Sequence, residues 1–172
     1  MMLLGSVATE AAQLAAQQMG DLCTGGQASG TGLRGAYYYA ASRGDKPLLV
    51  RVDARINADT ALSWPAPVAA AAPKLVRWCG WIRPIVSGPY RFRADAGALK
   101  VQIAKKAMTG PGANPDAFID MKAGELYPIF MELPLTGAVP RFSLQWTPPF
   151  GVTYDVPQTV LFPPVATVEP GC

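Results

Sequence analysis

The sequence of 172 residues contains no histidine. A Ser-His-Asp triad, a Cys-His pair and a zinc site with histidine ligands are therefore excluded within this chain. Three cysteines are present, and Cys23, Cys79 and Cys172 lie too far apart to form a CxxC metal or redox motif. We expect Cys79, which lies in an apolar stretch, to be a buried thiol. Cys23 and Cys172 could pair across the termini, although the sequence does not decide it.

Long apolar runs and blocks of like charge are also missing. No stretch reaches the roughly eighteen consecutive apolar residues of a transmembrane helix, so no membrane span is expected. Fifteen basic and twelve acidic side chains give a net charge of +3 without a basic block, which favours solubility and argues against nucleic acid as a partner. The first basic residue is Arg34, and Glu10 interrupts the early apolar run, so no secretory signal is recognised.

Residues 1–22 show a helical pattern. Ser6 is in position to act as N-cap, and Gly20 is in position to end the helix. A narrow apolar stripe follows this helix, formed by Val7, Ala11 and Leu14. Because a helix this short is marginally stable alone, we expect the stripe to dock on another chain of a larger assembly.

Glycine and proline mark both boundaries of the rest of the chain. The glycine-rich residues 23–32 indicate a flexible linker after the helix. The proline-rich residues 164–172 indicate an extended C-terminal tail. We therefore expect one folded domain over residues 33–163.

Within this domain, apolar and polar residues alternate over many short stretches. Tyr90 and Phe92 alternate with Arg91 and Arg93, and the same period of two recurs at residues 99–103, 127–131 and 142–146. Clusters of glycine and proline separate these stretches, and no internal helix pattern is present. Many short strands of this kind predict an all-β, antiparallel β-sandwich.

Six motifs of the domain occur in the order found in a known family. They are GLRGAYY (32–38), VRVDARIN (50–57), LVRWCGWIRPIVSGPYRFRADAGALKV (75–101), AGELYPIFMEL (123–133), FSLQWTPP (142–149) and VPQTVLF (156–162). In these motifs the chain resembles, over roughly residues 32–163, the β-sandwich family named for the anthrax toxin protective antigen, found in bacterial toxins, glycosidases and yeast adhesins. The resemblance implies a jelly-roll-type sandwich that binds carbohydrate.

The resemblance also implies a place for calcium. In the sugar-binding members, two adjacent aspartates before a glycine hold a calcium ion that contacts sugar hydroxyls. This chain has Ala94-Asp95-Ala96-Gly97 there, so one acid remains, and calcium needs several charged oxygen ligands. Asn114 and Asp116 could supply further oxygens if their loop folds over the turn. The alternative is that Asp95 accepts backbone hydrogen bonds of the turn. We expect an impaired calcium site and no other cofactor.

Basic residues suggest a contact surface. Arg83, Arg91 and Arg93, together with Arg77 and Lys100, could share one sheet face around Trp81. Such a face could contact a glycan or a protein neighbour, or could be a solvated outer face. Glycosidase chemistry needs two converging carboxylates, and nothing beside Asp53 and Asp59 suggests a tuned acid. We therefore expect no enzyme.

Two functions remain open from the sequence. The favoured one is a non-catalytic structural or interaction module, displayed on a virion, a tail or secretion apparatus, or its own oligomer. The alternative is a glycan-binding or adhesion module. Both place the domain on the extracellular face or on the surface of an assembly.

Calcium should leave the stability of the protein unchanged. A ligand that binds only the folded state raises the melting temperature, and a turn with one acid should bind calcium too weakly to do so. The melting temperature is measured in millimolar calcium and in chelator, for the natural sequence and for Asp95→Ala. A rise of several degrees that Asp95→Ala abolishes would contradict this prediction.

Overall fold

The computed structural model describes residues 30–39, 46–57, 73–94, 98–110, 113–114, 117–135 and 142–164. In these ranges the chain forms β-strands and one short 3-10 helix, Gln158–Val160, and no α-helix. The predicted N-terminal helix, with its stripe of Val7, Ala11 and Leu14, lies outside the described residues, as do residues 165–172 of the predicted tail. Within the same ranges no helix has the length and apolarity needed to cross a membrane.

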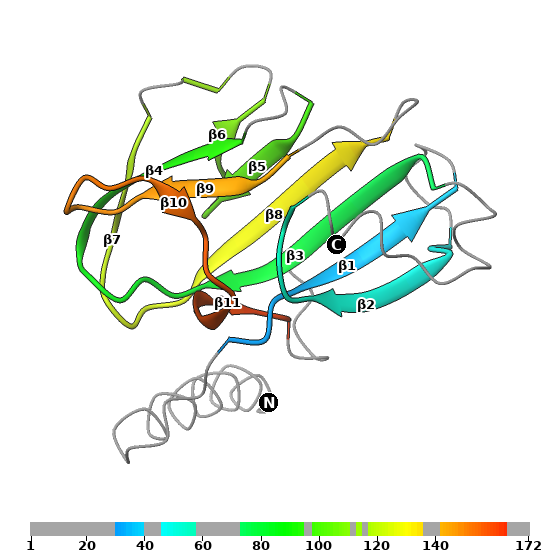
Figure 1. Cartoon of the computed structure of the whole chain (residues 1–172), viewed down its shortest axis with the longest axis horizontal. Helices are drawn as coiled ribbons and strands as arrows, with labels where there is room; N and C mark the ends of the chain where they lie inside the picture. The colour runs from blue at the N-terminus through cyan, green and yellow to red at the C-terminus, as the bar shows by residue number, and fades with distance from the viewer. Residues whose placement is uncertain are drawn as a thin grey trace, which may run out of the picture.

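The strands form two antiparallel sheets (Figure 1). The large sheet has the order β2-β1-β3-β8-β5-β6, and β11 also pairs with β3. Its strands are β1 (Leu33–Tyr38), β2 (Leu49–Asp53), β3 (Leu75–Ile82), β5 (Lys100–Ile103), β6 (Lys106–Thr109), β8 (Tyr127–Pro134) and β11 (Leu161–Phe162). The small sheet has the order β10-β9-β4-β7. Its strands are β4 (Gly88–Ala94), β7 (Ile119–Met121), β9 (Leu144–Thr147) and β10 (Tyr154–Asp155).

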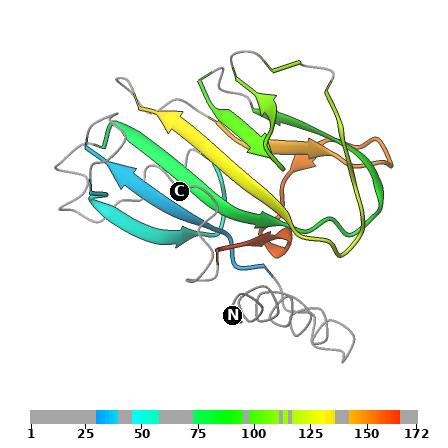
Figure 2. The same cartoon turned by 180° about the vertical axis from the view of Figure 1, so that it is seen from behind.

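The two sheets enclose one hydrophobic core, and Figures 1 and 2 show their arrangement from opposite sides. Side chains alternate along β4 as predicted, because Tyr90 and Phe92 are buried and the arginines between and after them are exposed. Trp78 from the large sheet and Trp146 from the small sheet are both fully buried in this core. The prediction of an all-β, antiparallel fold is confirmed.

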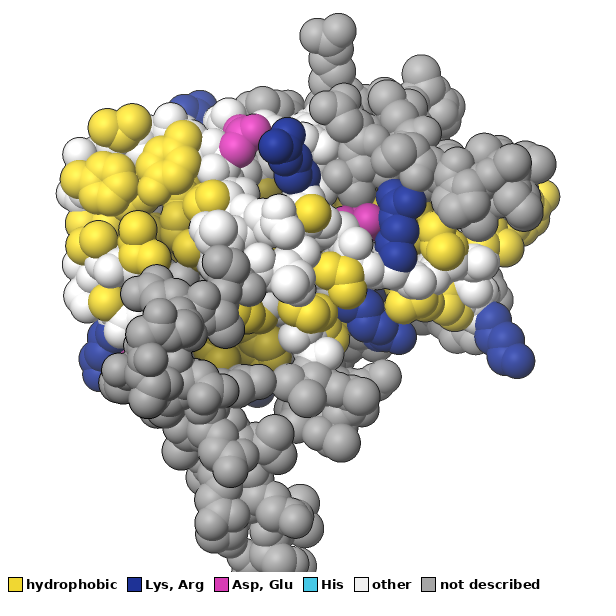
Figure 3. Space-filling view, turned by 60° about the horizontal axis from the view of Figure 1, so that its bottom comes forward, with side chains coloured by type: hydrophobic (Ala, Val, Ile, Leu, Met, Phe, Trp, Pro, Cys, Tyr) yellow, Lys and Arg dark blue, Asp and Glu magenta, His cyan; other side chains and the backbone are white. Residues whose placement is uncertain are grey.

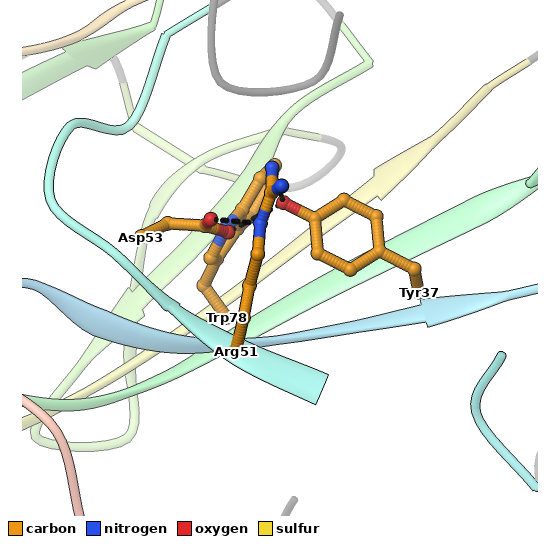
Figure 4. Close-up of polar contacts among 4 residues, drawn as sticks. All are labelled: Tyr37, Arg51, Asp53 and Trp78. Atoms are coloured by element: carbon orange, nitrogen blue, oxygen red, sulfur yellow. Dashed lines mark hydrogen bonds and ion pairs between the residues drawn. The ribbon is translucent and has the colours of Figure 1, made fainter. Parts of the chain in front are cut away.

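A buried carboxylate joins three strands of the large sheet (Figure 4). Asp53, at the end of β2, is only 3% exposed. Its Oδ2 accepts hydrogen bonds from the Tyr37 hydroxyl on β1 (2.5 Å) and from Trp78 Nε1 on β3 (2.7 Å). Its Oδ1 accepts one from Arg51 Nε at 2.7 Å, which also balances the charge. Burying a charge is tolerated only when it is paired and hydrogen-bonded, and Asp53 meets both conditions.

The strand register makes room for this carboxylate. Gly35 on β1 lies opposite Arg51 on β2 and opposite Trp78 on β3. A Cβ atom at Gly35 would overlap Asp53 Oδ2 and would lie 3.0 Å from Trp78 Nε1. Because glycine has no Cβ, the carboxylate and the indole can meet over this position. The absence of a side chain at Gly35 is therefore part of the site.

The end of the predicted linker belongs to the folded domain. Gly30 N donates to Thr159 O at 2.9 Å, and Gly32 N donates to Leu161 O at 3.0 Å. A Cβ atom at Gly30 would overlap the backbone oxygen of Leu161, so this glycine permits close backbone approach. The prediction of a flexible linker is therefore wrong for residues 30–32. Residues 23–29 lie outside the described residues.

Cys79 corrects a second expectation. It lies on the outer face of β3, because its neighbour Trp78 points into the core. It is buried as predicted, but it is disulfide-bonded and is not a free thiol. Sequence spacing could not show this, since a disulfide depends on proximity in the fold. Cys23 and Cys172, whose pairing was left open, lie outside the described residues.

Truncation of the buried carboxylate should destabilise the fold strongly. Asp53→Ala leaves the Tyr37 hydroxyl and Trp78 Nε1 buried without an acceptor, so we expect a loss of about 3 kcal/mol or more in the free energy of unfolding. Asp155→Ala is the matched control, because Asp155 is exposed and accepts one hydrogen bond from Gln145 (3.1 Å). Its loss should stay below about 0.5 kcal/mol. Urea denaturation measures both, and equal losses would contradict the assigned role of Asp53.

Because of the same network, the free energy of unfolding should fall at high pH. Burial, the hydrogen bond to Asp53 and the charge of Asp53 raise the pKa of Tyr37 far above its usual value of 10.0, against the opposing effect of Arg51. The folded state therefore keeps a proton that the unfolded state loses, and stability falls as the pH rises above about 10. Burial also raises the pKa of Tyr90.

We expect Tyr37→Phe to be less stable near neutral pH but to lose less further stability between neutral pH and about pH 11 than the natural sequence. Urea denaturation at a series of pH values measures this slope. The contribution of Tyr90 remains in both proteins and cancels from the comparison. Identical slopes would show that Tyr37 does not carry the effect.

Candidate binding groove

A groove crosses the outer face of the small sheet. Because β-strand side chains alternate between faces, burial of Tyr90 and Met121 directs their neighbours on β4 and β7 outward. Pairing of β4 with β7 places Pro89 opposite Asp120, and pairing of β4 with β9 places Arg91 opposite Thr147. The turn after β9 closes one end of this face. The groove has a volume of about 490 Å³ and is lined by Pro89, Arg91, Phe118, Asp120, Thr147, Pro148, Pro149 and Gly151.

The polar groups of the groove are a cation, an acid and a hydroxyl. Arg91 and Asp120 are both exposed, and within the described part of the chain neither forms an ion pair. Thr147 Oγ1 lies 2.7 Å from Thr153 Oγ1 in the following turn. Arg91 can donate hydrogen bonds and Asp120 can accept them. The groove therefore offers both kinds of partner to a ligand.

An aromatic ring forms an apolar side of the groove. Phe118 is 48% exposed, although it directly precedes β7. Lys106 holds this position, because its Nζ donates to the Phe118 backbone oxygen at 2.8 Å and lies 5.9 Å from the centroid of the Phe118 ring. The exposed ring thus has a contact from β6 of the large sheet.

The structure separates the residues that the sequence grouped around Trp81. Arg91 lines the groove, and Arg93 lies further along the same face of β4, opposite Gln145. Trp81 lies on β3 of the large sheet, and Arg83 follows that strand with its guanidinium 4.5 Å from the Phe162 ring centroid. The expectation of one shared face is therefore wrong, because β4 pairs with β7 and β9 and not with β3.

The remaining basic residues of that group share one carboxylate on the large sheet. Arg77 Nε lies 3.0 Å from Glu132 Oε2, and Lys100 Nζ lies 3.2 Å from Glu132 Oε1. Burial alone would raise the pKa of Glu132, but the hydrogen bonds and charges of Arg77 and Lys100 outweigh it and lower this pKa. This face therefore carries paired charges, while the face of the groove carries an unpaired arginine.

The predicted calcium ligands give no cluster in the described part of the chain. Asp95 and Asp116 lie outside the described residues. Asn114 is described, and its backbone oxygen accepts a hydrogen bond from Ala117 N at 2.9 Å. Among the described residues, no three acidic or cysteine side chains gather in a way that could hold a metal ion. The impaired calcium site stays a prediction.

The sequence did not identify most residues of the groove. Arg91 was identified from its alternation with apolar neighbours, and the same signal could have pointed to Asp120, which lies between the apolar Ile119 and Met121. Phe118, Thr147 and Pro149 carried no signal, because an apolar residue or a turn proline predicts burial or a bend as readily as a binding surface. Only the pairing of β7, β4 and β9 brings them together.

Comparison with known proteins finds solved structures with a similar fold. No model of a protein family matches the sequence, and no curated protein matches it. A solved structure of an anti-sigma factor domain-containing protein from Clostridium clariflavum superposes with a TM-score of 0.63 and 26% identity. The match covers 80% of this chain and 49% of that one. The chain therefore spans about half the length of this similar protein.

Two further structures share the fold at lower identity. The transport component C2-II of the C2 toxin from Clostridium botulinum has a TM-score of 0.63 and 16% identity, over 81% of this chain and 28% of that one. The PA14 domain of an antifreeze protein has a TM-score of 0.56 and 15% identity, over 77% of this chain and 89% of that one. The resemblance seen in the sequence is thus supported at the level of the fold: the domain is a β-sandwich similar in fold to these structures.

Proposed function

We propose that this protein is a non-catalytic binding module that recognises carbohydrate through the groove of the small sheet. The observation that carries the proposal is the combination of the exposed Phe118 ring with Arg91 and Asp120 in one groove. A sugar ring presents an apolar C–H face and hydroxyl groups at its edge, and each hydroxyl both donates and accepts hydrogen bonds. The ring of Phe118 suits the apolar face, and the two charged groups suit the edge.

The chemistry of the groove favours binding without catalysis. Hydrolysis of a glycosidic bond uses two carboxyl groups on opposite sides of the bond. Of the described residues that line the groove, Asp120 is the one carboxylate, so they do not include the pair that this chemistry uses. A ligand would therefore be held and released unchanged.

The disulfide of Cys79 bears on the location of the module. Disulfides persist in oxidising compartments such as the cell exterior, and Cys79 is disulfide-bonded. This supports an extracellular or surface location, where a carbohydrate ligand would be met. Display on a virion, a tail or a secretion apparatus through residues 1–22 remains a prediction, because those residues lie outside the described ranges.

Removal of either the Arg91 or the Phe118 side chain should weaken carbohydrate binding. The protein is screened against an array of neutral and acidic cell-surface oligosaccharides, and the strongest binder is titrated by calorimetry. Arg91→Ala should raise the dissociation constant about tenfold or more, because a hydrogen bond to a charged group contributes about 1.5–3 kcal/mol. Phe118→Ala should also raise it, because the apolar face of the sugar loses the ring that it contacts. The melting temperature checks that both variants remain folded.

Arg93→Ala is the matched control, since it removes the same side chain from the same face of β4 outside the groove. It should leave the dissociation constant within about twofold, because a distant exposed charge contributes little. Binding of no oligosaccharide would overturn carbohydrate as the ligand. Equal losses for Arg91→Ala and Arg93→Ala would point to general charge attraction in place of this groove.

A further inference from the structure

The disulfide of Cys79 has two candidate partners within this chain. Cys79 lies on β3 and is disulfide-bonded, and residues 1–172 contain two other cysteines, Cys23 and Cys172. Both of these lie outside the described residues. The strands that surround Cys79 are described, and they favour one partner over the other.

The partner of Cys79 must approach from the solvent side of the large sheet. Successive side chains of a strand point to opposite faces, and Trp78 points into the core, so Cys79 points outward. Arg34 and Phe130 lie opposite Cys79 on the neighbouring strands β1 and β8, and both are partly exposed. The sulfur atom of the partner therefore lies outside the sandwich.

Strand β11 directs the chain toward Cys79. It pairs antiparallel with β3, and Phe162 lies opposite Trp81. Each residue after Phe162 therefore advances one position toward the start of β3, where Gly80 and then Cys79 follow. A Cβ atom at Gly80 would overlap the backbone oxygen of Phe162, so the end of β11 already lies against Gly80.

The chain after β11 leaves the plane of the sheet on the side of Cys79. Beyond Gly80 the position beside β3 is occupied by β1, because Arg34 pairs with Cys79. The other edge of β3 pairs with β8 along its whole length, and the inner face is filled by the core. The solvent side remains, and Pro163 and Pro164 are both partly exposed. These prolines thus lead the chain onto the face that carries the Cys79 sulfur atom.

The N-terminal segment leads away from the disulfide. Gly32 N donates to Leu161 O, opposite the last residue of β3, and Gly30 N donates to Thr159 O beyond it. Traced backward from β1, the chain thus passes the end of β3 and continues away from the disulfide. Cys23 precedes Gly30 by seven residues, so it would have to return past this point.

The C-terminal residues have the length and composition for the shorter path. Cys172 follows the last described residue by eight positions, which span about 26 Å when extended, so the chain can cross the face and return. Pro170 and Gly171, directly before Cys172, favour a turn. Residues 165–172 carry one acid, Glu169, and two valines. Figure 3 shows basic and apolar side chains at the surface on the side of the molecule where β11 lies.

We propose that Cys172 is the partner of Cys79 and that residues 165–172 form a strap across the outer face of the large sheet. The two thiols form one S–S bond and release two protons and two electrons. A disulfide-bearing oxidant accepts them by thiol–disulfide exchange and is reduced to two thiols. This bond excludes a link between Cys23 and Cys172.

The strap closes a loop around the small sheet. Residues 79–172 contain β4, β7, β9 and β10, and with them every described residue that lines the groove. A cross-link stabilises a protein by restricting its unfolded chain, and more so for a longer loop. The bond from Cys79 to Cys172 therefore stabilises the sheet that carries the groove, whatever the groove binds. A bond from Cys79 to Cys23 would enclose β1 and β2 instead.

Peptide mapping of the full chain without reduction tests the proposal. Free thiols are first alkylated, and trypsin then cleaves after lysine and arginine but not at Arg83, which precedes a proline. The three cysteines fall on three separate peptides, residues 1–34, 78–91 and 142–172. We expect mass spectrometry to find 78–91 linked to 142–172, with 1–34 linked to neither. A link of 78–91 to 1–34 or to a second copy of itself, or an unlinked 78–91, would overturn the proposal.

Substitution separates the two candidate partners by their effect on stability. Cys172→Ser should lower the melting temperature by about 5 °C or more, because it opens a long cross-linked loop. Cys23→Ser is the matched control, since it changes the other candidate in the same way, and it should leave the melting temperature within about 1 °C. Equal effects, or the reverse pattern, would contradict the assignment. The peptide map needs no variant, so it identifies the partner even if Cys172→Ser does not fold.

Discussion

The carboxylate of Asp53 is the constraint on which the large sheet depends. A charge buried to this degree is stable only if its partners are all in place, and they come from three different strands. Tyr37 on β1 and Trp78 on β3 meet Asp53 only when both strands adopt the observed register beside β2. Trp78 is also a central residue of the core. The hydrogen bonds of one carboxylate thereby link the pairing of the strands to the orientation of one of the two largest core side chains.

The two outer faces of the sandwich carry different electrostatics. On the large sheet, Arg77 and Lys100 both donate hydrogen bonds to Glu132. On the small sheet, Arg91 faces solvent in a groove beside Asp120 and Phe118. Paired exposed charges contribute little to binding, whereas an arginine beside an exposed aromatic ring is typical of recognition surfaces. The small sheet is therefore the face on which we place the function.

The turn between β9 and β10 forms one side of the groove. Pro149 and Gly151 face the groove, and Phe150 between them stacks on Tyr154. This turn is rigid because Phe150 stacks on Tyr154, and Tyr154 in turn contacts the buried ring of Trp146. A ligand in the groove would thus contact a segment that packs through Tyr154 on the core.

The sequence by itself determined the class of fold and the orientation of side chains, because the period of two at β4, β5 and β8 sets which residues enter a core. It also excluded histidine-based catalysis outright. Only the tertiary structure decided which faces are shared, since pairing between distant strands leaves no local pattern. It separated Arg91 from Trp81, joined Arg91 to Phe118 and Asp120, and gave Asp53 its partners and Cys79 its disulfide. Local periodicity records burial, whereas binding surfaces depend on contacts between segments far apart in the chain.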